Sequence, residues 1–245
     1  MSNVFIGTSG FSYEHWYERF YPSSLAKGEM LSFYSQHFQT VEVNSSFYRL
    51  PFEGMIKGWY RRSPKDFKFV LKAPRRITHL LKLLDCQDVL KTFLDRISGL
   101  SEKLAILLFQ LPPGLKKDIP RLKGFIQELP PNFSHTIEFR NNSWFDEETF
   151  SLLRKHNIAC CIVSAPKIET HFVATAPFVY IRLHGTSSWY NYDYSMDELR
   201  QLSFEIKRFL ENGLDAYCYF NNDFEAYAIK NAKELMDLVK FDGHS

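Results

Sequence analysis

The sequence lacks long apolar segments and any strong excess of charge. None of its apolar runs approaches the ~20 residues that a transmembrane helix needs. The first residues, MSNVFIGTSG, contain neither the basic nor the long apolar region of a secretory signal. The formal net charge of +2 at pH 7 argues against a nucleic-acid surface covering the whole molecule, but leaves room for a local basic patch. We therefore expect a cytoplasmic protein that does not associate with membranes.

Cysteine is scarce, and several cofactor motifs are missing. Cys160, Cys161 and Cys218 lie within apolar runs and Cys86 begins a helical stretch, with no CxxC pair and no metal-ligand spacing. We expect these thiols to be reduced and buried. No GxGxxG, P-loop or GxSxG pattern is present, so the sequence predicts no dinucleotide fold, P-loop or serine-nucleophile elbow. We expect neither a cofactor nor a bound metal.

What the sequence does contain is a series of short apolar runs separated by stretches of helical periodicity. The runs are VFIGTS from Val4, TVEVNSS from Thr40, FKFVLKAP from Phe67, LAILLFQL from Leu104, HTIEFR from His135, IACCIVS from Ile158, FVYIRLHG from Phe178 and AYCYFNND from Ala216. Strands that alternate with helices predict an α/β fold with a parallel sheet. About eight such units predict one (β/α)8 barrel of the TIM type over residues 1–245, with its site at the carboxyl ends of the strands. The segment between Val163 and Phe178 is short and has proline near both ends, so we expect one degenerate unit there.

Side chains alternate between the two faces of a strand, so every second residue of a barrel strand faces the interior. In TVEVN, Val41 and Val43 share one face while Glu42 and Asn44 share the other. We assign the apolar members of each run to the helix layer and the polar members to the interior. The polar residues expected to converge near the C-terminal mouth are Thr8, Glu42, Asn44, Lys72, Gln110, Glu138, Arg140, Arg182, His184 and Asn221.

This interior set contains more cations than carboxylates, and buried charges are costly unless they are paired. One explanation is a purely structural network in which Glu42 and Glu138 balance some of the cations. The explanation we favour is a polar ligand site whose positive surplus meets an anionic group. The loops after the strands add ligand-binding candidates, namely Tyr48, Arg75, His79, Trp189 and Asp223. Aromatic rings beside arginines suit sugars, nucleotides or unstacked bases, although Asp223 could equally cap the last helix.

Several blocks of the sequence resemble a known family. They are GTSGFSY from Gly7, TVEVNSSFYRLP from Thr40, KAPRRITH from Lys72, QLPP from Gln110, EFRNNSWF from Glu138, RLHG from Arg182 and YFNND from Tyr219. In order and in residues they resemble the YecE-like family, a bacterial and archaeal domain of unknown function, over nearly the whole chain. The resemblance implies a TIM-barrel fold and no activity. In that family's pattern an arginine often follows the His-Gly of RLHG, whereas this chain has Thr186 there.

Our leading hypothesis is a phosphate-bearing ligand, such as a sugar phosphate, a nucleotide or a nucleic-acid end, processed by metal-independent acid/base chemistry. In this hypothesis Glu138 is the general acid or base, Glu42 its partner, and His184 or His79 a proton carrier. The anion is held by the cations of the interior set, which are Lys72, Arg140 and Arg182. The remaining ligand contacts come from Asn44, Gln110, Asn221 and the loop residues named above.

Other readings stay open at this stage. The same mouth could hold nucleic acid or a partner without catalysis. A metal-dependent hydrolase or isomerase would need carboxylates and histidines, but the neighbouring cations would repel a divalent ion. Lys72 could form a Schiff base if its pKa were depressed. Glu42 and Glu138 are the right residue types for glycoside hydrolysis. The sequence leaves the oligomeric state, and whether the protein is an enzyme, undecided.

Overall fold

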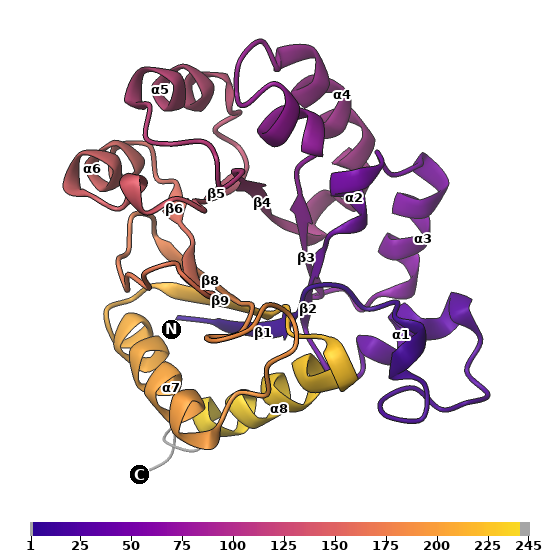
Figure 1. Cartoon of the computed structure of the whole chain (residues 1–245). Helices are drawn as coiled ribbons and strands as arrows, with labels where there is room; N and C mark the ends of the chain where they lie inside the picture. Colours follow the sequence, from indigo (N-terminus) through magenta and orange to yellow (C-terminus); the bar gives the residue numbers. More distant parts are fainter. Residues whose placement is uncertain (1, 241–245) are drawn as a thin grey trace.

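The computed structural model describes residues 2–240, in which strands and helices alternate along the chain (Figure 1). The strands are β1 (Val4–Thr8), β2 (Thr40–Val43), β3 (Lys68–Lys72), β4 (Leu104–Gln110), β5 (Ser134–Glu138), β6 (Ala159–Cys160), β7 (Ile162–Ser164), β8 (Phe178–Leu183) and β9 (Asp215–Phe220). The α-helices are α1 (Met30–Tyr34), α2 (Ser45–Tyr48), α3 (Glu53–Arg62), α4 (Gln87–Ile97), α5 (Ile119–Glu128), α6 (Glu147–Lys155), α7 (Met196–Glu211) and α8 (Tyr227–Lys240). Short helical turns are η1 (Glu14–Trp16), η2 (Lys27–Glu29), η3 (Arg76–Leu80), η4 (Ser98–Lys103), η5 (Asn142–Trp144) and η6 (Phe224–Ala226). Within residues 2–240, no helix is both long enough and apolar enough to cross a bilayer.

The strands form two parallel sheets, which confirms the predicted α/β class. One sheet has the order β1-β9-β8-β7 and the other the order β2-β3-β4-β5-β6. At one junction the sheets meet through an isolated bridge between Ser9 and Glu42, where the Gly10 N–H donates to the Glu42 carbonyl at 2.7 Å. At the other junction Cys161 separates β6, which pairs with β5, from β7, which pairs with β8. The predicted closed barrel is therefore not observed as one continuous hydrogen-bonded sheet.

The core has two layers because the strands alternate in side-chain direction. Apolar side chains such as Val41, Leu71 and Ile181 pack in the cluster that includes the helices. A smaller buried cluster on the opposite strand faces includes Val70, Ile106, Leu108, Tyr180 and Tyr219. The polar residues that end several of these strands follow the second cluster in register, so the interior is apolar below and charged near the strand ends.

As expected from its short length, the connection between β7 and β8 contains no crossover helix. No helix forms over residues 165–177, and Pro166 and Pro177 stand near its two ends. The buried Thr175 hydroxyl donates to the Ile158 carbonyl at 2.6 Å and accepts from the Cys160 N–H at 2.7 Å. Without a crossover helix, a largely apolar cavity of about 680 Å³ remains beside α7.

Candidate functional site

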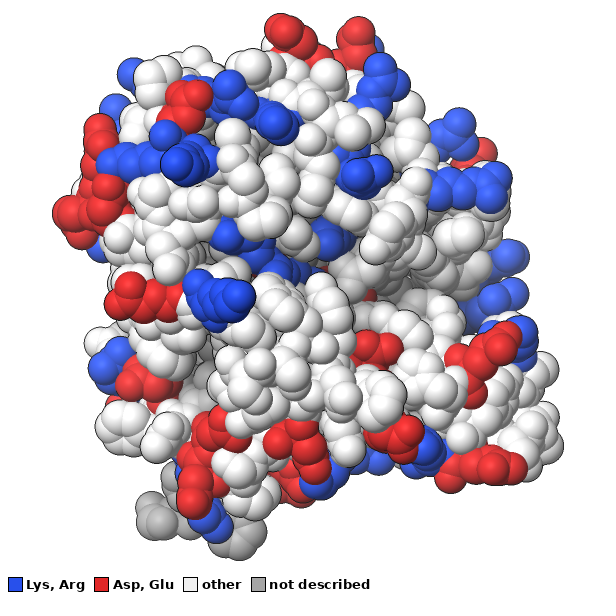
Figure 2. Space-filling model, viewed as in Figure 1, with Lys and Arg blue, Asp and Glu red and all other residues white. Residues whose placement is uncertain are grey.

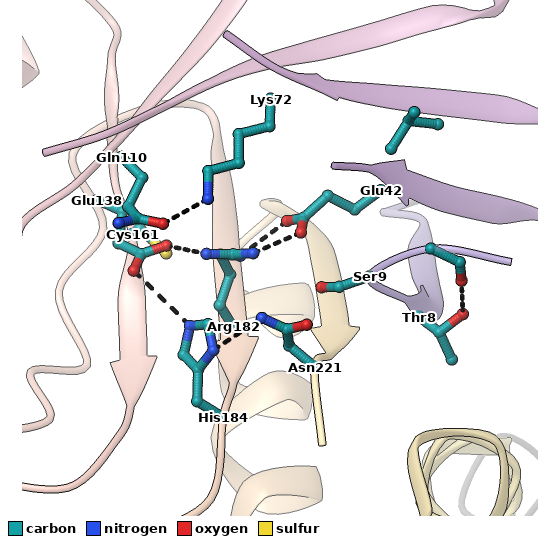
Figure 3. Close-up of polar contacts among 12 residues, drawn as sticks. Thr8, Ser9, Glu42, Lys72, Gln110, Glu138, Cys161, Arg182, His184 and Asn221 are labelled. Atoms are coloured by element: carbon teal, nitrogen blue, oxygen red, sulfur yellow. Dashed lines mark hydrogen bonds and ion pairs between the residues drawn. The ribbon is translucent and has the colours of Figure 1, made fainter. Parts of the chain in front are cut away.

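The centre of the site is Arg182, which bridges two carboxylates on strands from the other sheet. Its guanidinium meets Glu42 with two hydrogen bonds, Nε to Oε2 at 2.8 Å and Nη2 to Oε1 at 2.6 Å. Its Nη1 donates to Oε2 of Glu138. Figure 3 shows Glu42 and Glu138 flanking Arg182 from opposite sides. The Tyr180 hydroxyl, two residues earlier on β8, donates to Glu42 Oε2 at 2.5 Å. Because Arg182 is 1% exposed, this contact ties the two sheets together inside the molecule.

A second chain of contacts leads from Glu138 towards the surface. Arg140 Nε donates to Glu138 Oε1, so each oxygen of this carboxylate is held by a different arginine. Arg140 Nη2 lies 2.8 Å from His184 Nε2, and His184 Nδ1 lies 3.0 Å from the Asn221 amide nitrogen. Since a guanidinium is only a donor, Nε2 accepts, and a neutral ring then carries its proton on Nδ1, which pairs with Asn221 only when the amide of Asn221 is turned to present its oxygen.

The network fixes the charge states of its members. Burial alone would raise the pKa of Glu138, but Arg140 and Arg182 outweigh it and hold the pKa well below the usual carboxyl range. Burial, together with the same two arginines, lowers the pKa of His184 to about 3. Ion pairs thus join the buried Glu42 and Glu138 side chains to Arg182 and Arg140, and at neutral pH Glu138 is charged while His184 is uncharged.

Lys72 is the cation that this balance leaves over. Its ammonium donates to Gln110 Oε1 at 2.6 Å and lies 4.1 Å from the centre of the Phe47 ring. No carboxylate within residues 2–240 lies at ion-pair distance from it, and in Figure 3 it points towards Arg182. Burial and the charge of Arg182 lower the pKa of Lys72 to about 7. Figure 2 shows Lys and Arg side chains around the hollow at the centre of this face.

Aromatic residues from the loop after β8 fold back over the network. Gly185 makes this turn with a φ of +109°, and a Cβ there would lie 2.2 Å from the Ser188 carbonyl oxygen, so glycine is required. The Tyr190 N–H donates to the His184 carbonyl at 2.8 Å. The Arg140 guanidinium lies 4.7 Å from the centre of the Trp189 ring. Trp189, predicted as a ligand contact, is thus partly exposed and packs its ring against Arg140.

Two predicted residues of the loop after β3 stand beside Lys72. His79, in η3, packs against Phe47 with ring centroids 5.1 Å apart. Burial and the charges of Lys72 and Arg75 lower the pKa of His79 to about 4. Arg75 is exposed, and its side chain has no ion-pair partner among residues 2–240. Arg75 therefore extends the positive region to the rim, whereas His79, with a pKa of about 4, is uncharged at neutral pH.

The structure brings eight of the predicted residues together, six in the Arg182 network and the Lys72–Gln110 pair beside it, and leaves others outside. The eight are Glu42, Lys72, Gln110, Glu138, Arg140, Arg182, His184 and Asn221. Asp223 instead lies beside His15, with a side-chain separation of 3.6 Å. Tyr48 is 81% exposed. Asn44 stands at the start of α2, and its buried Oδ1 has no hydrogen-bond partner in the described part of the chain.

The prediction for Thr8 was wrong, because β1 presents its other face to the interior. The Thr8 hydroxyl contacts Tyr34 of α1, at 2.9 Å, and the Gly10 carbonyl. Ser9 is the interior residue, and its buried hydroxyl has no hydrogen-bond partner within residues 2–240 (Figure 3). The run VFIGTS does not alternate polar with apolar residues, so its period could not identify the inner face.

Two further side chains of the site, Tyr180 and Phe47, were not among the predicted site residues. Tyr180 shares a strand face with Arg182 and His184, which was a usable signal for its contact with Glu42. Phe47 precedes the exposed Tyr48 in a helix of four residues, and nothing in its sequence neighbourhood indicates that its ring contacts Lys72. In the described part of the chain, no three His, Cys, Asp or Glu side chains converge as a metal-ligand set.

The fold and site together define an α/β protein of parallel sheets with a buried ion network at the ends of its strands. The chain belongs to the family described as protein of unknown function DUF72, whose model matches residues 5–245. It is 25% identical to the UPF0759 protein YunF of Bacillus subtilis (strain 168), over 98% of this chain and 95% of that protein. It is 27% identical to the UPF0759 protein YecE of Escherichia coli (strain K12), over 75% and 74%. The resemblance to the YecE-like family is thereby confirmed.

Solved structures of the same family have the same fold. A DUF72 family protein from Thermotoga maritima MSB8 superposes with a TM-score of 0.88 at 30% identity, covering 97% of this chain and 99% of that one. A DUF72 family protein from Enterococcus faecalis V583 superposes with a TM-score of 0.85 at 20% identity, covering 96% and 95%. The second likeness concerns the fold alone. The family description and the relatives' names state no activity.

Proposed function

We propose that the protein binds a small phosphate-bearing ligand at the C-terminal mouth and processes it by metal-independent acid/base chemistry. The ligand class is a sugar phosphate, a nucleotide or a nucleic-acid end. The observation that carries the proposal is Lys72, a largely buried cation whose partner is the neutral amide of Gln110 rather than a carboxylate. A phosphate group bound there would supply the missing counter-charge.

Within this proposal Lys72 is also the group that moves a proton. Efficient acid/base groups have pKa values near the working pH, and the pKa of Lys72 is about 7. His184, with a pKa of about 3, is a weak base. Glu138 has both oxygens engaged by arginines. We therefore assign Glu138, Glu42 and His184 a positioning role, in which they hold Arg140 and Arg182.

The remaining contacts of the ligand follow from what surrounds Lys72. Arg75 and His79 add donors on the rim, and the Trp189 ring offers a face on which a sugar or base can stack. Ser9 Oγ and Asn44 Oδ1 are buried polar atoms without partners in the described part of the chain, so they are free to bond to ligand hydroxyl groups.

The same proposal treats the strands as one (β/α)8-type barrel. In this view β6 and β7 are one strand interrupted at Cys161, and the bridge between Ser9 and Glu42 completes the ring. The Arg182 contacts to Glu42 and Glu138 support it, because they cross the interior between the two sheets. Barrels of this kind keep their sites at the carboxyl ends of the strands.

The test is ligand binding by isothermal titration calorimetry with inorganic phosphate, glucose 6-phosphate and adenosine monophosphate. We expect saturable binding of at least one probe to the unmodified protein and its loss in Lys72→Met. Lys68→Met is the matched control, since Lys68 begins the same strand at the opposite end. Equal binding by the two variants, or no binding of any probe, would contradict the proposal.

An exposed basic and aromatic rim favours single-stranded nucleic acid as a second candidate ligand. Tyr48, Arg49, Arg75 and Arg76 are exposed and line one shallow cavity beside α4. Stacking rings interleaved with arginines suit unpaired bases and their phosphates. Binding of an oligonucleotide without a terminal phosphate, weakening steeply with salt, would support this candidate. Binding of the small probes alone would remove it.

A further inference from the structure

We propose that Lys72 is a nucleophile that forms a Schiff base with a small carbonyl compound carrying a phosphate or carboxylate group. The anionic part of that substrate class rests on the proposed function above. The carbonyl part rests on the placement of the Lys72 amine, which is fixed, uncompensated and directed into the site.

The contacts of Lys72 hold its nitrogen in place without neutralising it. Gln110 Oε1 lies 2.6 Å away and accepts one N–H bond. The Phe47 ring, itself buried, covers one side at 4.1 Å. Neither group takes the lone pair of a neutral amine, so that pair stays available to a carbonyl carbon. An ordinary surface lysine has neither restraint, because its flexible stem and hydrated ammonium move freely.

The charged and titratable neighbours keep a large share of this amine neutral. Burial and the charges of Arg182 on β8 and Arg140 after β5 lower the pKa of Lys72, whereas Glu138 and Glu42, which are paired with arginines, raise it, and the net result is a pKa of about 7. His79 in η3, with a pKa of about 4, is uncharged at neutral pH. About half of the Lys72 amine is then uncharged at neutral pH, against roughly one in three thousand for an ordinary lysine.

The reaction balances within the site and solvent. The neutral Lys72 nitrogen attacks the carbonyl carbon, forming a C–N bond and a carbinolamine. The carbonyl oxygen leaves as water and carries away the two hydrogens of the amine. The resulting imine takes one proton from solvent to become an iminium ion. The anionic group of the substrate then pairs with the positive iminium nitrogen at Lys72, where the proposed function places the phosphate.

The test is reductive trapping on the full chain. The protein is incubated with dihydroxyacetone phosphate or pyruvate, sodium borohydride reduces any imine to a stable secondary amine, and peptide mass spectrometry locates the added mass. We expect Lys72 to be modified at least about tenfold faster than Lys68 at neutral pH, since its neutral fraction is larger. Modification spread over the surface lysines, with Lys72 no faster than Lys68, would overturn the proposal.

Two further arms separate this proposal from the proposed function. Glycerol 3-phosphate has no carbonyl group, so its saturable binding without trapping of dihydroxyacetone phosphate would leave the anion site standing and remove the Schiff base. Absence of both would remove both. The comparison uses the unmodified chain, so it does not depend on a variant that folds.

Discussion

Replacing Arg182 with methionine tests whether this arginine provides the counter-charge that the buried Glu42 and Glu138 carboxylates need in the folded protein. Arg182 is 1% exposed and makes two bonds to Glu42 and one to Glu138. After the substitution Glu138 keeps Arg140, whereas Glu42 keeps only the Tyr180 hydroxyl. One buried carboxylate is thus stranded rather than two. Breaking a buried pair in this way costs about 3–5 kcal/mol of unfolding free energy.

The assay is urea denaturation followed by tryptophan fluorescence, with two reference variants. Glu42→Gln combined with Arg182→Met removes the stranded charge, so it should recover most of the loss. Arg200→Met is the surface control, because Arg200 pairs with Asp197 in an exposed i,i+3 contact and should cost under about 1 kcal/mol. An Arg182→Met variant no less stable than Arg200→Met would refute the reasoning.

Three further predictions concern the charge states and the loop over the site. Because the pKa of Glu138 is depressed in the folded protein, its ionised carboxylate stabilises the fold fully above the unfolded carboxyl pKa of about 4.3, and this stabilisation is lost progressively as the pH falls below that value. The free energy of unfolding should therefore fall less steeply with acidification in Glu138→Gln than in the unmodified protein. The lowered pKa of Lys72 means that its charged form destabilises the folded protein, and this cost is largest below pH 7. Lys72→Met should therefore raise the free energy of unfolding by about 2–4 kcal/mol near pH 6 and by less as the pH rises above 7, as measured by urea denaturation at pH 6 and pH 9. Gly185→Ala should lower stability by about 1–3 kcal/mol and expose Trp189, checked by thermal melting and fluorescence quenching; an unchanged melting temperature would contradict the assigned turn.

The strand positions and most inward faces could be predicted from the sequence. The period of two in runs such as TVEVN and FVYIRLH separates residues facing the helices from those facing inward, and Glu42, Arg182 and His184 lie where it predicts. The same rule failed for Thr8 because a run with a central glycine and two adjacent hydroxyl residues carries no contrast between its faces. The period of two also could not predict that the sheets are interrupted at Cys161, because the pairing between strands is a tertiary property.

The identity of the partners in the network could not be predicted. Sequence placed three cations and two carboxylates at one end of the fold, and either a structural or a ligand-binding account was open. Which cation remains uncompensated depends on side-chain reach across the interior, and the structure leaves Lys72 rather than Arg182 without a carboxylate. The neighbouring Phe47 ring, which restrains Lys72, comes from a short helix whose position no local pattern indicates.

The central claim is that Lys72 is a desolvated amine without a carboxylate partner and that it binds an anionic group of the ligand. Measuring the pKa of its side chain tests this claim most directly. The measurement is NMR of isotopically labelled lysine across pH, with and without inorganic phosphate, assigned by Lys72→Arg. We predict a pKa of about 7 in the free protein and a higher value with phosphate, because an anion favours the charged form. A pKa near the ordinary lysine value of about 10.4, unchanged by phosphate, would contradict the account.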